Sequence, residues 1–154
     1  MIRIESVDVE QQLDEELVWI QRVAHPTQQS LQGVGDTIRG LFAENFDREG
    51  NGSGAWVPLA RSTQRERQRL GYPPSHPILV RRGAYRDSFV RAGAPGNVDE
   101  FDGDTYYAGS DDYRVGFHES EAPRTLIPAR RVIDFDSMQQ DQIGESLDRW
   151  VENG

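Results

Sequence analysis

Residues 27–46 read TQQSLQGVGDTIRGLFAENF, and this stretch decides the fold because its apolar residues recur at helical spacing. The residues that fall along one side of such a helix are Leu31, Val34, Ile38, Leu41, Phe42 and Phe46. Gly33, Gly35 and Gly40 each weaken the helix by about 1 kcal/mol relative to alanine. The stretch therefore predicts a long helix with one buried face, in which the glycines mark either close packing or a looser helix.

The N-terminal residues 1–26 are predicted to form a strand followed by a helix. Residues 1–5 alternate apolar and polar side chains, as a short strand does. Asp8 can cap the helix, which ends near His25 because Pro26 disfavours a helical conformation in the residue before it. The apolar residues at helical spacing are Leu13, Leu17, Ile20 and Ala24, with Val18 and Trp19 beside them.

The region after the long helix predicts short elements joined by turns. Residues 47–55 are rich in glycine and are predicted to be a flexible loop. Thr63 and Glu66 have the spacing of a capping box, which predicts a short helix that ends at Gly71. Residues 85–90 fit a short helix or a strand. An antiparallel meander of three strands is predicted over residues 97–101, 105–108 and 113–117.

A last helix is predicted over residues 137–151. Its inward-facing residues are expected to be Met138, Ile143, Leu147 and either Trp150 or Val151. Helices near both ends with a small antiparallel sheet between them indicate an α+β fold. The length of 154 residues suits one domain that spans residues 1–154.

The composition narrows the possible classes of protein. Hydrophobic residues make up 36% of the chain and the mean hydropathy is -0.71, which describes a polar chain that can still fold. No apolar run approaches the roughly 18 residues that a membrane span needs, and residues 1–5 do not resemble a signal peptide. The absence of cysteine excludes disulfides, thiolate catalysis and cysteine-ligated zinc. The sequence predicts a soluble protein that starts in a cytoplasm.

Charge is distributed unevenly along a chain whose formal net charge is -9. Residues 61–91 contain eight arginines and two acidic residues, whereas residues 1–60 and 92–154 are both acidic. All 17 basic residues are arginine, which reflects either a GC-rich genome or a preference for forked contacts. A basic band between acidic flanks suits head-to-tail self-association, in which the band of one subunit meets the acidic face of the next. Alternatively, the basic band is a helix face that is exposed to solvent and contacts no other subunit.

No catalytic residue, cofactor site or metal site is predicted. Asp47-x-Glu49-x-Asn51 opens like a calcium-binding loop, but Pro58 stands at the twelfth position, where that loop needs a glutamate. His118 lacks the second histidine, four residues further on, that a zinc peptidase helix needs. His118 is therefore predicted to be a packed or hydrogen-bonded histidine.

Several apolar and arginine residues are candidates for contacts between subunits. Trp56 and Leu59 bring apolar area that is buried either under the chain's own helix or against a neighbour. Arg130, which follows Pro128, can hold a carboxylate or a carbonyl across an interface, or form a local salt bridge. The full set is Trp56, Leu59, Arg61, Arg65, Arg69, Tyr85, Arg86, His118, Pro128 and Arg130.

An ordered run of short signatures extends from residue 45 to residue 130. It consists of Asn45-Phe46, Gly50, Trp56-Val57-Pro58-Leu59, Ser62-Thr63, Ile78-Leu79, Gly83-Ala84-Tyr85-Arg86-Asp87-Ser88, His118 and Ile127-Pro128-Ala129-Arg130. In this order and spacing, residues 28–151 resemble the phage virion morphogenesis (tail completion) family. Glu119-Ser120-Glu121 departs from the family's pattern, in which a polar residue and a glycine usually follow the histidine.

The resemblance implies a structural protein of the head–tail neck of a bacteriophage virion, assembled in the host cytoplasm. It implies a homo-oligomeric ring, expected to be a hexamer, that caps the tail tube and docks to head–tail connector proteins. The genome would pass through an acidic lumen without specific binding, and a channel lined by Arg65, Arg69 and Arg82 would contradict this. Three alternatives stay open: a head-side connector or adaptor, a small hydrolase that uses His118, and a DNA-binding module that uses the basic band.

Overall fold

The computed structural model describes residues 6–103, 105–120 and 127–153. Within them the chain forms six helices and two antiparallel sheets of two strands each, which confirms the predicted α+β class. The elements are α1 (Ser6–Ala24), α2 (Gln32–Asp47), β1 (Gly50–Asn51), β2 (Gly54–Ala55), α3 (Arg61–Arg69), α4 (Ala84–Val90), β3 (Asn97–Asp102), β4 (Thr105–Ser110), α5 (Val115–His118) and α6 (Ser137–Asn153). The predicted strand at residues 1–5 lies outside the described residues.

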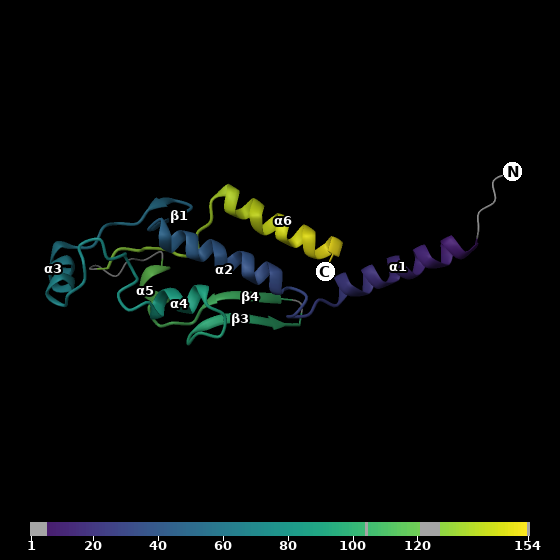
Figure 1. The fold of residues 1–154 in the computed structure, drawn as a ribbon, viewed down its shortest axis with the longest axis horizontal. Coiled ribbons are helices and arrows are strands. Elements are labelled where there is room, and N and C mark those ends of the chain that lie inside the picture. Colours follow the sequence, from purple (N-terminus) through teal and green to yellow (C-terminus); the bar gives the residue numbers. More distant parts are fainter. Residues whose placement is uncertain (1–5, 104, 121–126, 154) are drawn as a thin grey trace.

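The molecule is elongated, with α2 along its middle (Figure 1). Helix α6 lies along one side of α2, and α4 and the β3–β4 hairpin lie along the other side. Helix α3 stands at one end of the molecule, and α1 extends outward from the opposite end. The two ends of the molecule are therefore made by different helices.

Helix α2 supplies the core, as its sequence predicts, but it begins at Gln32 instead of residue 27. Thr27 and Ser30 exchange hydrogen bonds before it, since each backbone N–H donates to the hydroxyl of the other residue, at 3.0 and 3.1 Å. Such side-chain bonds offer the backbone an alternative to the helix, so a turn precedes α2.

Aromatic rings from several segments pack against the buried face of α2. Phe46 meets Trp56 with ring centroids 5.7 Å apart, and Phe42 meets Phe89 with centroids 5.2 Å apart, both edge to face. Tyr85 and Phe89 of α4 also meet edge to face. Fully buried aromatic rings contribute large apolar areas, so this cluster is the main hydrophobic core.

A polar cluster joins α2 to the β3–β4 hairpin. Asp99 of β3 accepts hydrogen bonds from Arg39 of α2 and from the Tyr106 hydroxyl of β4. Burial, together with the Asp99 carboxylate, raises the pKa of Tyr106 to about 12, so the phenol stays protonated and donates. Arg39 is buried and also pairs with Asp36, which compensates its removal from water.

Gly35 allows this cluster to approach α2 closely. A Cβ at Gly35 would collide with the Tyr106 hydroxyl, whereas a Cβ at Gly40 of the same helix would meet nothing within 4 Å. We expect Gly35→Ala to lower the free energy of unfolding by about 2 kcal/mol through overpacking. The matched control Gly40→Ala should raise it by about 0.5–1 kcal/mol, because alanine favours helix. Urea denaturation of both variants tests the pair, and equal effects would contradict the close approach.

The predicted third strand of the meander is wrong. Strands β3 and β4 pair in register from Asn97 with Ser110 to Asp102 with Thr105, but residues 115–118 form helix α5. Asp112 turns the chain there, because its carboxylate accepts hydrogen bonds from the backbone N–H and the guanidinium of Arg114. This local turn ends the hairpin.

The predicted capping box before α3 is also wrong. Helix α3 begins at Arg61, two residues before Thr63, and no side chain caps its first turn. Gln64 holds the entry instead, since its side-chain amide donates to the Leu59 carbonyl at 2.9 Å. The predicted stop is confirmed, because Gly71 has a φ of 85°, a conformation that favours glycine.

The segment 47–55, predicted to be a flexible loop, contains the short β1–β2 hairpin. The Gly52 N–H donates to the Asp134 carbonyl at 2.8 Å, and the Asn51 amide donates to the Arg131 carbonyl at 3.0 Å. The Ser53 hydroxyl donates to the Asp134 carboxylate at 2.6 Å. Hydrogen bonds to the chain that precedes α6 thus hold the glycine-rich segment.

Helix α6 is confirmed, but its predicted inward face is only partly right: Ile143 and Trp150 are half-buried, whereas the prediction is wrong for Met138 and Leu147. Met138 is 72% exposed and Leu147 is 40% exposed, whereas Gln139 and Ser146 are buried against α2. The Gln139 amide donates to Asn45 of α2, and the Thr37 hydroxyl donates to the Ser146 hydroxyl at 3.2 Å. Because of these polar pairs, Gln139 and Ser146 face α2, and Met138 and Leu147 face away from it.

Helix α1 lies largely outside the body of the molecule (Figure 1). Its apolar residues Leu17, Val18, Trp19 and Ile20 are between 44% and 63% exposed. The Trp19 indole N–H donates to the Val151 carbonyl of α6 at 2.9 Å, next to the point where α1 leaves the body. Among the described residues, no helix combines the length and the apolar character that crossing a membrane requires.

Candidate functional site

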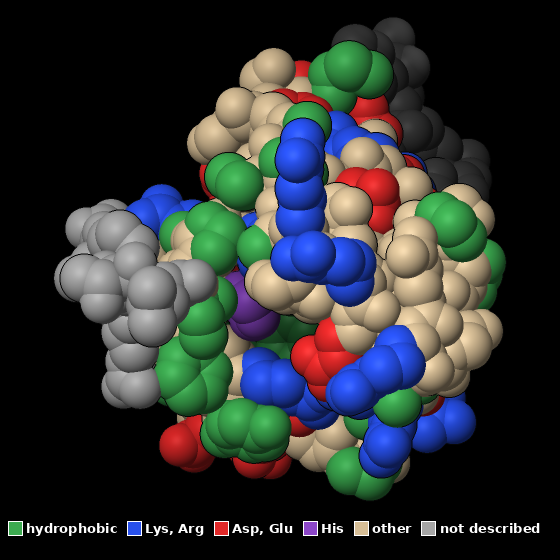
Figure 2. Space-filling model, turned by 90° about the vertical axis from the view of Figure 1, so that its left-hand side faces the viewer, with side chains coloured by type: hydrophobic (Ala, Val, Ile, Leu, Met, Phe, Trp, Pro, Cys, Tyr) green, Lys and Arg blue, Asp and Glu red, His purple; other side chains and the backbone are tan. Residues whose placement is uncertain are grey.

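A hollow of about 530 Å³ opens at the α3 end of the molecule. We call it the arginine hollow; its apolar lining is Val57, Pro58, Leu59, Leu79, Ile127 and Pro128, and its basic lining is Arg67, His118 and Arg130. Four residues that the sequence selected, Leu59, His118, Pro128 and Arg130, thus meet in one place. Figure 2 views this end of the molecule, where arginine side chains and an acidic side chain border a depression with hydrophobic side chains on one side.

Arg130 forms one wall of the arginine hollow and is 6% exposed. Its guanidinium donates to the carbonyls of Val57 at 2.8 Å and Pro58 at 3.2 Å. Burial lowers the pKa of Arg130, and the positive charge of Arg67 lowers it further. Arg130 therefore holds the chain after β2 in place, and no carboxylate of the described residues forms an ion pair with it.

Arg67 forms the facing part of the arginine hollow. Its Nη1 donates to the carbonyls of His76 at 3.2 Å and Pro77 at 2.8 Å, whereas its Nε is buried without a hydrogen-bond partner. Burial, and after it the charge of Arg81, lowers the pKa of Arg67. Sequence reasoning missed Arg67, although it lies one helical turn after Thr63, another residue of the hollow.

His118 is half-buried beside these arginines. Its ring hydrogen-bonds to the Pro128 carbonyl, and its Nδ1 is buried with no partner among the described residues. The ring lies 5.7 Å from that of Tyr85. Burial, together with the charges of Arg130 and Arg114, lowers the pKa of His118, so the imidazole is neutral near pH 7. His118 is a packed, hydrogen-bonded histidine, as the sequence predicts.

Two buried guanidinium groups therefore share a hollow in which, among the described residues, the only carboxylate that shifts the pKa of either is Glu49, whose charge acts on Arg67 without forming an ion pair. In the part of the chain that the structure describes, neither Arg67 nor Arg130 forms an ion pair. Glu119 is near, but its carboxylate accepts the N–H groups of Val132 and Ile133. An uncompensated buried charge is costly, and a carboxylate from outside would relieve that cost. The arrangement suits the binding of a carboxylate that has apolar neighbours.

The lowered pKa of His118 predicts a pH dependence of stability. The unfolded chain binds a proton on this residue more readily than the folded chain, so stability is lost as the pH falls below the ordinary histidine pKa of 6.5. We expect His118→Gln to lose less unfolding free energy than the wild type between about pH 7.5 and about pH 5.5. Urea denaturation at both values tests this. Burial raises the pKa of Glu119, which acts in the opposite direction in both proteins; an equal loss in both proteins would contradict the prediction.

The outer side of α3 carries the three arginines that the sequence selected on this helix. Arg61, Arg65 and Arg69 are all exposed, and we call them the α3 ridge. Helical spacing places them on one side, and Arg67 points inward from another. The α3 ridge and the arginine hollow make this end of the molecule strongly basic.

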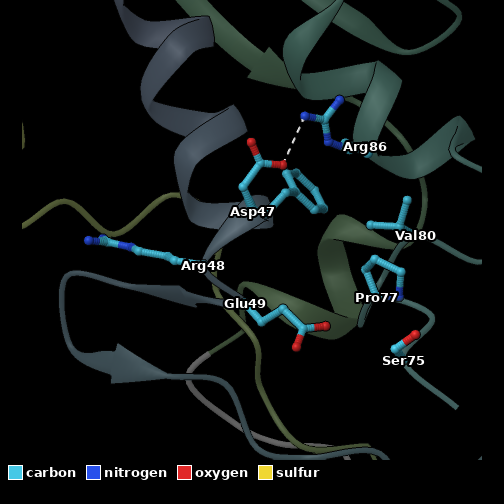
Figure 3. Close-up of a pocket in the computed structure, with 8 residues that line it drawn as sticks. Asp47, Arg48, Glu49, Ser75, Pro77, Val80 and Arg86 are labelled. Carbon is cyan, nitrogen blue, oxygen red and sulfur yellow. Dashed lines mark hydrogen bonds and ion pairs between the residues drawn. The ribbon is translucent and has the colours of Figure 1, made fainter.

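The remaining candidates lie elsewhere. Trp56 and Tyr85 are 5% and 2% exposed and belong to the core, so a role in contacting a neighbour is not supported for them. Arg130, in the arginine hollow, donates to carbonyls of its own chain, so it could act on a neighbour through the positive charge that it brings to the hollow. Arg86 pairs with Asp47 at 3.1 Å, at the rim of a second pocket of about 360 Å³ (Figure 3).

Asp47, Glu49 and Asn51 have the spacing of the first ligands in a calcium-binding loop, but their side chains do not point to a common centre. Asp47 turns toward Arg86, and Glu49 points toward the segment that contains Pro77 (Figure 3). Glu49 accepts the N–H of Ile78, and Asn51 donates to the Arg131 carbonyl. No group of three or more histidine or carboxylate side chains that could hold a metal ion occurs within the described ranges.

Comparisons of the chain with protein-family models, with curated proteins and with solved structures gave no match.

Proposed function

We propose that this chain is a structural subunit of a bacteriophage virion, acting as a tail completion or terminator ring at the head–tail neck. The observation that carries the proposal is the structural role of the signature residues in the fold. They are the residues on which the resemblance to the tail completion family rests. In the fold, Arg130 bonds to the backbone of the Trp56-Val57-Pro58-Leu59 signature, and Asn45 and Trp56 bond to the backbone just after Arg130. Their roles are architectural, as expected for a protein that works through its faces.

Four hydrogen bonds illustrate these roles of the signature residues. Asn45 donates to the Val132 carbonyl at 2.8 Å, and the Trp56 indole donates to the Arg131 carbonyl at 2.9 Å. Arg130 donates in the other direction, to the carbonyls that follow Trp56. Signatures that are far apart in the sequence thus form one connected unit, which supports a fold built around this run of residues.

Two exposed surfaces of the molecule support its assembly with other copies. The exposed apolar residues of α1 and the basic α3 end favour contacts with further chains. In the proposed virion, six copies form the ring, which contacts the tail tube protein and the head–tail connector proteins. The same reasoning applies to a ring on the head side of the neck, which is the alternative of the same class.

A DNA-binding module is the second candidate, because the α3 ridge exposes three arginines on one helix face. The two functions differ in what purified protein does. A ring subunit gives a discrete oligomer in native mass measurement and binds duplex DNA weakly. A DNA-binding module stays monomeric, and its affinity for duplex DNA falls steeply as salt is raised. A monomer with salt-sensitive DNA binding would contradict the proposed function.

A further inference from the structure

We propose that helix α1 of one copy docks on the α3 end of the next copy, with an α1 carboxylate in the arginine hollow. This inference rests on the proposed self-association and names the two surfaces that meet. It follows from the charge of the two surfaces, from their apolar residues and from their places in the fold.

Helix α1 offers acidic and apolar side chains together. It contains five acidic residues and one arginine, which gives a net charge of −4. Asp14 and Glu16 are exposed, and Leu17, Val18 and Ile20 follow directly with more than half of each side chain uncovered. Few residues of its own chain cover this helix (Figure 1). An exposed apolar helix of this kind normally marks an interaction surface.

The α3 end offers the complementary set. The α3 ridge is basic, and the exposed apolar residues beside it are Val57 at 52%, Leu70 at 49% and Ile127 at 37%. Between them lies the arginine hollow, where Arg67 is 9% exposed and its Nε lacks a partner among the described residues. A carboxylate that enters the hollow would receive charge-assisted hydrogen bonds, and apolar residues next to it would cover the apolar lining.

The two surfaces stand at opposite ends of one molecule, so a single chain does not bring them together (Figure 1). With a rise of about 1.5 Å per residue, the 19 residues of α1 span about 28 Å, enough to reach from one body to the next. A contact between unlike surfaces is head-to-tail, and such a contact closes into a ring when its rotation permits. The α3 ridge would then be covered by a neighbour and would not line the channel.

Charge reversal tests the contact. Asp14→Arg with Glu16→Arg reverses exposed charges of α1, and Arg65→Glu with Arg69→Glu reverses the α3 ridge. Each double variant should weaken self-association by about tenfold or more, measured by sedimentation velocity. An equimolar mixture of the two should restore pairwise association, because the unchanged α1 of the ridge variant meets the unchanged α3 end of the α1 variant. The control Arg149→Glu, at an exposed position on α6, should associate as the wild type does.

A second measurement uses the absence of cysteine from the chain. A copy with Leu17→Cys mixed with a copy with Leu70→Cys should form a disulfide-linked dimer under mild oxidation. Leu17→Cys mixed with Met138→Cys, on the exposed side of α6, is the control and should give far less of it.

The outcomes separate this inference from the proposed function. If both double variants form oligomers as the wild type does, or if their mixture does not restore association, the docking of α1 is overturned. Neither result contradicts the proposed ring. The same holds if the Leu70→Cys pair gives no more cross-linking than the control. A wild type that is monomeric and absent from virions would instead overturn the proposed function.

Discussion

Trp56→Ala is expected to lower the free energy of unfolding by about 4 kcal/mol, the largest single effect that the fold predicts. Trp56 is 5% exposed and packs edge to face on Phe46. Its indole N–H donates to the Arg131 carbonyl at 2.9 Å, so the substitution also removes one of the two donors to that carbonyl, the other being the Asn51 amide. The loss combines the removal of a large buried ring, the cavity that remains and one hydrogen bond.

Trp19→Ala is the matched control for this measurement, because Trp19 is 44% exposed on α1. It should lower the free energy of unfolding by about 1 kcal/mol or less. Urea denaturation monitored by circular dichroism suits both variants, at a fixed protein concentration because self-association adds to apparent stability. A loss at Trp56 no larger than at Trp19 would mean that Trp56 is a surface contact and not a core residue.

Asn45→Ala is expected to lower the free energy of unfolding by about 3 kcal/mol. Asn45 is fully buried on α2 and donates to the carbonyls of Val132 at 2.8 Å and Asp134 at 3.3 Å. Its own carbonyl accepts from Arg48 at 2.8 Å and from Gln139 at 3.2 Å. Alanine removes the amide donor of the buried Val132 carbonyl and one of several partners of the Asp134 carbonyl, Arg48 and Gln139, which is why the cost is large.

Asn153→Ala serves as the control, because Asn153 donates one exposed hydrogen bond near the end of α6. Its effect should stay within about 0.5 kcal/mol. Equal losses in the two variants would show that the buried amide does not join α2 to the segment before α6.

The long helix and the β3–β4 hairpin were predictable because local pattern determines them. In α2 the apolar residues follow one side of the helix, and Gly103 between β3 and β4 has a φ of 65°, as tight turns favour. The orientation of α6 was not predictable from its own sequence. Gln139 and Ser146 face inward because Asn45 and Thr37 of α2 supply their partners, and hydrophobic periodicity does not record such pairs.

The candidate site was predictable in part. Motif positions selected Leu59, His118, Pro128 and Arg130, and these residues do meet at the arginine hollow. Arg67 was missed, because among the arginines of α3 only the tertiary fold reveals which one turns inward. Trp56 could be read as core or as interface from sequence alone, since both environments bury an indole.

The distribution of charge along the sequence acquires a physical meaning from the arrangement of the elements. The basic band includes α3 at one end of the molecule, and the acidic N-terminal segment includes α1 at the other end (Figure 1). Sequence alone indicates only that the two kinds of charge are separated along the chain. Their separation in space is what makes contact between successive copies possible.

The most direct test of the central claim is an electron-microscopy reconstruction of an intact virion that carries this protein. We expect density for several copies of the chain arranged as a ring at the junction of head and tail, with α1 of each copy against the α3 end of the next. A reconstruction in which no density at the neck fits the chain, with the protein absent from purified virions, would contradict a structural role in the particle.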